Sequence, residues 1–153
     1  MGELENSSLI ARKLADVHFA VCASPDYLGV HGEPLHPSEL VGHEVLVYSN
    51  ISVGGQWFYQ RDGKRISPRM KYRLTANNGE FLAAVASCGH AIVNGPVALL
   101  QNYLASGALV RILDDFQRPA VGMYAVYPPG RMVATRVRMF SDALSEHFSE
   151  RTI

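Results

Sequence analysis

The chain has 153 residues, of which 48% are apolar and 18% are charged, and its 14 basic and 14 acidic residues cancel at neutral pH. Such a composition predicts a globular protein with one hydrophobic core, or with one core and fragments of another. It lacks the basic surface of a nucleic-acid-binding protein, and no apolar run reaches the ~20 residues of a membrane span, so we expect neither partner.

The first part of the chain alternates strand and helix patterns. The apolar run HFAVCA, residues 18–23, predicts a buried strand, and Ser24 and Pro25 suit the cap and the first position of a following helix. This short helix should carry Tyr27 and end near Gly32. A second short helix is predicted in HPSEL, residues 36–40, and a second strand in EVLVYS, residues 44–49.

A hairpin, two helices and a strand are predicted in the middle of the chain. Asp62-Gly63 lies between two strand-like runs and is the strongest short hairpin signal in the sequence. Asn77-Asn78-Gly79 then ends the second run. The remaining elements are a helix in residues 80–89, a short buried strand in residues 90–96 and a helix in residues 97–107.

Two further strands and an amphipathic helix complete the chain. The strands are predicted in ALVRIL, residues 108–113, and in VGMYAVYP, residues 121–128. In the helix ATRVRMFSDALSEHF, residues 134–148, four apolar side chains fall on one side: Val137, Phe140, Leu144 and Phe148. Strands that alternate with helices of this length predict an α/β fold with a largely parallel sheet.

Reactive side chains are present, but their spacing predicts no catalytic or metal site. Cys88 lies on the apolar face of its helix whereas His90 follows a glycine, so the two side chains should diverge. The six histidines never form an i, i+4 pair on a helix. Asp114-Asp115 is best explained as a pair of solvated loop carboxylates. We therefore predict no enzymatic activity, no metal and no cofactor.

The cysteines and the start of the chain indicate a reducing compartment. Cys22 and Cys88 both lie in apolar segments with no second ligand nearby, which predicts buried free thiols. The opening MGELENSSLIARKL lacks the basic start and apolar middle of a secretion signal. The expected location is the cytoplasm.

Small or polar residues follow three of the predicted strands, and each set precedes a helix. In an open parallel sheet the ligand binds outside the carboxyl ends of the strands, where helix N-termini offer free N–H groups to a small anion such as a carboxylate. An equally good alternative is that Ser24 and the asparagines only cap their helices. The candidate ligand-binding residues are Ser24, Pro25, Ala76, Asn77, Asn78, Asn94, Gly95 and Pro96.

Taken in order, these segments resemble the effector-binding domain of the LysR-type transcriptional regulators. The stretch SSLIARKLADVHFAVCASPDYLGVHGEPLHPSELVGHEVLVYS, residues 7–49, is similar to the family's Arg-Lys-Leu run, Ser-Pro-x-Tyr-Leu helix and Pro-x-x-Leu turn. Trp57 before the hairpin and the segments at residues 76–115 and 123–148 extend the resemblance over nearly the whole chain. Many members have an apolar residue where this chain has Asn94-Gly95, close to the expected pocket.

The resemblance implies a two-lobed fold like that of periplasmic binding proteins. It implies that residues 19–127 form the second lobe, and that residues 1–18 and 128–153 are remnants of the first lobe. The DNA-reading region and the opening half of the first lobe are then expected to be missing, and Met1 is either a natural start or a boundary introduced later. The family also implies a homo-oligomer in which paired domains lie side by side.

Two functions follow as hypotheses. The first is an effector-sensing module that binds a small organic anion between its lobes and signals to an absent DNA-binding domain by population shift. The alternative is a dimerisation or interaction fragment that binds no ligand. In either case we expect the final helix to pack on its own lobe or on a second copy of the chain, because its apolar stripe has lost part of its usual covering.

Overall fold

The computed structural model describes residues 10–50, 57–116, 118–128 and 135–149. Two compact units are present. Unit 1 comprises residues 1–18 and 120–153, from the two ends of the chain, and unit 2 comprises residues 19–119. Part of the predicted first-lobe remnant, residues 1–9, lies outside the described residues.

Unit 2 is built on a five-stranded sheet in the order β6-β3-β7-β2-β8. Its strands are β2 (Phe19–Ala23), β3 (Glu44–Tyr48), β6 (Lys71–Ala76), β7 (Ile92–Pro96) and β8 (Val110–Ile112). β3 runs parallel to β6 and β7, whereas β2 runs antiparallel to both its neighbours, β7 and β8. The α/β class is confirmed, but the sheet is mixed. Alternation of strands and helices does not encode strand direction, which depends on which strands become neighbours.

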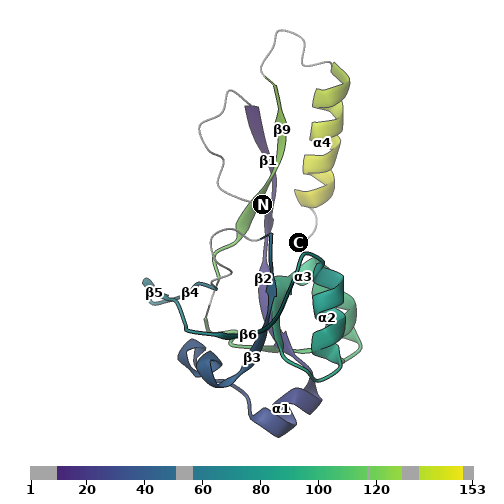
Figure 1. Ribbon diagram of the computed structural model, residues 1–153. Coiled ribbons are helices and arrows are strands. Elements are labelled where there is room, and N and C mark those ends of the chain that lie inside the picture. The colour runs from purple at the N-terminus through teal and green to yellow at the C-terminus, as the bar shows by residue number, and fades with distance from the viewer. Residues whose placement is uncertain (1–9, 51–56, 117, 129–134, 150–153) are drawn as a thin grey trace. The chain divides into compact units, whose positions relative to one another are not determined.

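Two helices cover one face of this sheet, α2 (Gly79–Ser87) and α3 (Val97–Ala105), which lie next to each other in Figure 1. Apolar side chains of both helices meet those of the strands in one cluster with almost no exposed surface. Its members include Ala20, Cys22, Leu46, Leu82, Ala86, Val93 and Leu100. The helical spacing predicted a packed face with Phe81, Leu82, Val85 and Cys88, but the buried residues of α2 are Leu82, Ala83 and Ala86, whereas Phe81 and Cys88 are exposed.

The other face of the sheet is covered by short elements. These are α1 (Pro25–His31), the 3₁₀ helix η1 (Pro37–Gly42) and the hairpin of β4 (Tyr59–Arg61) and β5 (Lys64–Ile66). The hairpin turn at Asp62-Gly63 has φ values of 51° and 72°, as its sequence predicts. Tyr27, Leu40, Trp57 and Tyr59 pack here against Val21, Val45, Val47 and Ile92.

Unit 1 consists of a two-stranded ribbon and a helix. β1 (Ile10–Val17) pairs antiparallel with β9 (Val121–Tyr127), with a register shift between Lys13 and Ala15. α4 (Thr135–Ser149) lies beside the ribbon in Figure 1 and contacts β1. Arg12 forms an ion pair with Asp142. The sequence did not predict β1, because charged residues interrupt its apolar pattern.

The position of β9 differs from the predicted division of the chain. Residues 19–127 were expected to form one lobe, but the backbone hydrogen bonds of β9 join it to β1 and therefore to unit 1. The boundary thus lies at Pro119 and not at Tyr127.

Among the described residues, no helix has both the length and the hydropathy that spanning a membrane requires.

The apolar stripe of α4 is only half buried. Ser141 is 3% exposed and faces the ribbon, with Leu144 and Phe148 partly buried beside it. In contrast, Phe140 and Met139 are each 65% exposed and Val137 is 40% exposed. The helix therefore packs on its own unit through its second half, and its first half presents apolar surface to solvent.

Candidate functional site

The sheet register does not bring all of the predicted ligand-binding residues together. Because β2 is antiparallel to β7, Ser24 follows β2 at the edge of the sheet where β7 begins. Asn77 and Asn78 follow β6 at the opposite edge, where β7 ends at Pro96. The prediction of one shared crevice is wrong for Ser24 and Pro25, because it assumed that β2 runs parallel to the other strands.

Ser24 is the cap of α1. Its side chain is 2% exposed, and its Oγ accepts a hydrogen bond from the backbone N–H of Tyr27 at 3.1 Å. Pro25 occupies the first turn, where its missing N–H removes no helical hydrogen bond. The capping alternative raised by the sequence is the correct one at this position.

The Asn77-Asn78 pair also has a structural role, at the start of α2. Asn78 Oδ1 accepts a hydrogen bond from the backbone N–H of Phe81 at 3.1 Å, and this caps α2. Asn77 is exposed, and Ala76 is half-buried with its carbonyl bonded to the N–H of Ser49 at 2.9 Å. None of the three directs a buried polar group at a ligand.

Asn94 differs from the other predicted residues. Its side chain is 5% exposed, and neither Oδ1 nor Nδ2 has a hydrogen-bond partner among the described residues. It lies in β7 opposite Val21 of β2, and Gly95 and Pro96 follow it opposite Ala20 and Phe19. A buried amide without partners is rare in folded proteins and calls for a functional explanation.

Two further buried polar groups lie on the same face of the sheet as Asn94. Tyr59 is 1% exposed and its hydroxyl has no partner within the described part of the chain. Arg118 places its guanidinium carbon 4.2 Å from the centroid of the Phe19 ring, and its Nη1 is buried and likewise without a partner there. We call Tyr59, Asn94 and Arg118 the unpartnered polar cluster.

Electrostatics link two members of this cluster. Burial raises the pKa of Tyr59 well above its usual value, and the nearby Arg118 charge opposes this shift. Burial also lowers the pKa of Arg118, and Tyr59 opposes that shift in turn. No sequence pattern indicates Tyr59 or Arg118, because their neighbours are set by how the hairpin and the segment after β8 fold against the sheet.

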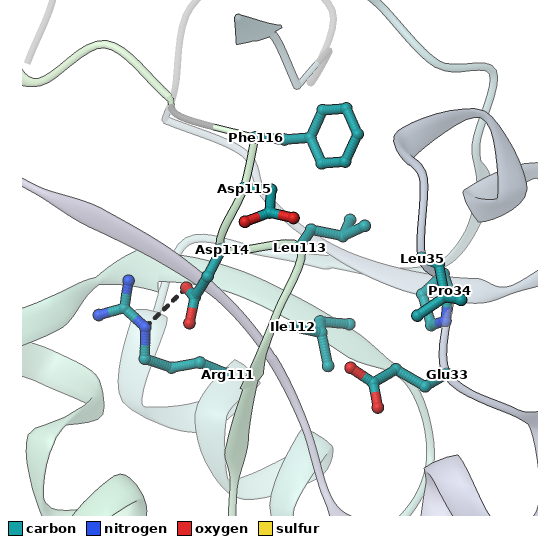
Figure 2. Close-up of a pocket in the computed structure, with 9 residues that line it drawn as sticks. All are labelled: Glu33, Pro34, Leu35, Arg111, Ile112, Leu113, Asp114, Asp115 and Phe116. Atoms are coloured by element: carbon teal, nitrogen blue, oxygen red, sulfur yellow. Dashed lines mark hydrogen bonds and ion pairs between the residues drawn. The ribbon is translucent and has the colours of Figure 1, made fainter. Parts of the chain in front are cut away.

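A hollow of about 220 Å³ lies beside β8 and is drawn in Figure 2. Its lining residues are Glu33, Pro34, Leu35, Arg111, Ile112, Leu113, Asp114, Asp115 and Phe116. Arg111 Nε is 2.8 Å from Asp114 Oδ1, so this charge is already paired. Both Asp114 and Asp115 are exposed, as expected of solvated loop carboxylates.

The cysteines and the remaining acidic groups offer no competing site. Cys22 is buried, and desolvation raises its thiol pKa to about 12. Cys88 is exposed, which corrects the prediction that both thiols are buried; it lies at the end of α2, beyond the packed face. Over the described ranges, no group of three or more His, Cys, Asp and Glu is arranged to hold a metal.

Comparison with known proteins identifies the chain's relatives. A family model described as the LysR substrate binding domain matches residues 1–149. The regulator PtxR of Pseudomonas aeruginosa is 32% identical over 147 residues, which are 96% of this chain and 47% of that protein. CrgA of Neisseria meningitidis serogroup B is 36% identical over 149 residues, which are 95% of this chain and 48% of that protein.

Solved structures agree with this assignment. The regulatory domain of CrgA superposes with a TM-score of 0.80 at 34% identity, covering 96% of this chain and 72% of that one. Full-length AphB of Vibrio cholerae superposes with a TM-score of 0.82 at 28% identity, covering 96% of this chain and 50% of that one. The chain thus spans about half the length of the curated relatives it matches.

Proposed function

We propose that this chain, which belongs to the LysR substrate-binding domain family, senses a small organic anion for a transcriptional regulator. The relatives named above are transcriptional regulators, and the chain is not an enzyme. Effector binding is the general role of this domain. The anionic character of the effector is the specific part of the proposal.

The charge of Arg118 is the observation that carries the anionic preference. Its guanidinium is partly buried, and no ion pair neutralises it within the described residues. A buried charge is stabilised by a partner of opposite sign, and an anionic effector would supply one. Arginine is also suited to a carboxylate, because its planar N–H groups can donate two parallel hydrogen bonds.

The proposed mechanism is a shift of population. An effector that binds one arrangement of the domain better than another increases the share of that arrangement, by as much as its two affinities differ. In the longer relatives, this change would reach the helix-turn-helix part to which their names refer. We propose the same output for a protein that contains this chain together with such a part.

A thermal-shift screen tests the proposal. Small carboxylic and aromatic acids are compared with their uncharged amides, since a ligand that binds only the folded state stabilises it, by about 2.7 kcal/mol at 100 times its Kd. We expect acids to raise the midpoint of unfolding and the matched amides to leave it unchanged. Stabilisation by the amides alone, or by no member of either set, would contradict an anionic effector.

A second candidate function is self-association without a ligand. It is favoured by α4, where Met139 and Phe140 are each 65% exposed. Exposed apolar surface of this kind drives protein association. The two candidates differ in one outcome, because an interaction fragment would show a concentration-dependent midpoint and no response to any acid.

A further inference from the structure

The unpartnered polar cluster has the hydrogen-bonding groups of a small binding site. Tyr59 and Asn94 are at least nine-tenths buried, at 1% and 5% exposure, and their polar side-chain atoms have no partners among the described residues. Groups of this kind are normally bonded to protein, water or a ligand. Here three such residues come from β4, β7 and the segment after β8, and one local packing defect does not account for all three.

The strand register places Asn94 and Arg118 near each other. Asn94 pairs with Val21, and Phe19 lies two residues further along the same face of β2. Diagonal neighbours of this type are about 7–8 Å apart. Because the Arg118 guanidinium lies over the Phe19 ring, Arg118 reaches the same end of the strand pair as Asn94.

Tyr59 completes the arrangement. Its ring belongs to the apolar cluster that contains Val21 and Ile92, on the face of the sheet that Asn94 also occupies. The phenol and the Arg118 guanidinium are close enough to affect each other's ionisation. All three residues belong to unit 2, so the region does not depend on how the two units are placed.

The free atoms define the chemistry of a complementary ligand. Arg118 Nη1, Asn94 Nδ2 and the Tyr59 hydroxyl can each donate a hydrogen bond, which suits the two oxygens of a carboxylate. Asn94 Oδ1 can only accept, so the ligand also needs a donor near its carboxylate. A hydroxyl on the adjacent carbon provides that donor without adding a charge.

We propose that the unpartnered polar cluster binds a small 2-hydroxycarboxylate, with its carboxylate on Arg118 and Tyr59 and its hydroxyl donating to Asn94 Oδ1. This inference rests on the proposed effector-sensing function and names the class of ligand. A 2-amino acid fits less well, because its ammonium group would lie close to the Arg118 guanidinium. A simple carboxylate would leave Asn94 Oδ1 without a partner.

Isothermal titration of the 153-residue chain tests this with matched probes. Glycolate and lactate are compared with acetate and propionate, which lack only the hydroxyl, and with alanine, which replaces it with an ammonium. We expect the hydroxy acids to bind about tenfold or more tightly than the deoxy acids, because a deoxy acid leaves the buried Asn94 Oδ1 without a partner. Equal binding of lactate and propionate, or no binding of either, would overturn the proposal.

Three variants locate the binding in the cluster. Tyr59→Phe removes only a hydroxyl, Arg118→Met removes only the charged head, and Asn94→Leu replaces an amide by an apolar group of similar size. Each should weaken lactate binding by about tenfold or more, because each removes a hydrogen-bonding group of the site and leaves its partner on the bound ligand unsatisfied. Arg111→Met and Asn102→Ala are the matched controls; both residues are exposed, and binding should be unchanged.

Asn94→Leu also separates a ligand site from a structural one. If the cluster is kept for a ligand, removing its unpartnered amide should raise the thermal midpoint of the free chain while abolishing the lactate response. If a buried water already satisfies Asn94, the variant should lower the midpoint instead, and the proposal fails. Should the screen of acids yield a ligand whose affinity all three variants leave intact, this proposal fails while the proposed function stands.

Discussion

The Tyr27 hydroxyl lies 3.2 Å from Nδ1 of His43 and accepts a hydrogen bond from the backbone N–H of Glu44 at 3.1 Å. The phenol can donate its proton to Nδ1 or accept one from it, according to the tautomer of His43. Tyr27 is 1% exposed, and its ring centroid is 4.4 Å from that of His31. This bond joins α1 to the start of β3.

This geometry makes the stability of unit 2 sensitive to pH. Burial lowers the pKa of His43, the charge of His31 lowers it further, and Glu39 opposes both. Because the folded pKa lies below the unfolded value of 6.5, the unfolded chain takes up protons first. The free energy of unfolding should therefore be fully retained above pH 6.5 and fall as the pH drops towards the folded pKa.

Urea unfolding between pH 5 and pH 7.5 measures this effect. His43→Gln should flatten the pH dependence, because glutamine does not titrate. The exposed His90 provides the control, and His90→Gln should retain the slope of the parent chain. A parent-like slope in His43→Gln would assign the pH dependence to other groups.

The two helix caps should contribute measurably to stability. Ser24→Ala and Asn78→Ala each remove a side-chain acceptor from a helix N-terminus, which costs about 1 kcal/mol in the free energy of unfolding. Asn77→Ala is the matched control, since Asn77 is exposed and is not the cap. Chemical denaturation of the three variants checks the prediction, and an equal loss in Asn77→Ala would contradict it.

Only one of the two thiols should react in the folded chain. Cys88 is exposed, whereas Cys22 is buried with a pKa raised to about 12, so it offers almost no thiolate. A maleimide reagent followed by mass spectrometry should show one label on the native chain, on Cys88, and two after denaturation. Rapid native labelling of Cys88→Ser would show that Cys22 is accessible.

Self-association should depend on the exposed first half of α4. Phe140 is 65% exposed, so Phe140→Asp removes apolar surface with little effect on the free energy of unfolding, within about 0.5 kcal/mol. Sedimentation velocity should show the parent chain as an oligomer at high concentration and the variant shifted towards monomer. Ala143→Asp, which adds the same charge at another exposed position of this helix, is the control and should leave the association unchanged. A parent chain that sediments as a monomer throughout would contradict the prediction.

The chain by itself should not bind duplex DNA. Its formal net charge is zero, and sequence-independent DNA binding depends on neutralising phosphates with Lys and Arg. Electrophoretic mobility at low and moderate salt should show no retardation of a random duplex. Salt-sensitive retardation that selects one sequence would overturn this expectation.

Local patterns predicted those features that depend on neighbours in the chain. The Asp62-Gly63 turn and the caps at Ser24 and Asn78 all follow from residues within one or two turns of each other. The order of segments was likewise sufficient to identify the LysR family. The turn and the caps are encoded by residues close together in the chain, and the family is encoded by the order of the segments.

The tertiary structure decided which of these residues can act together. Strand direction is set by pairing between distant segments, and the antiparallel β2 moved Ser24 away from Asn78 and Pro96. The same pairing left the Asn94 amide buried without a partner on the face occupied by Tyr59, and placed Arg118 over Phe19. Sequence alone determined the family and most of the described elements, though not β1, whereas the candidate site exists only because folding removes water from polar atoms that lie far apart in the chain.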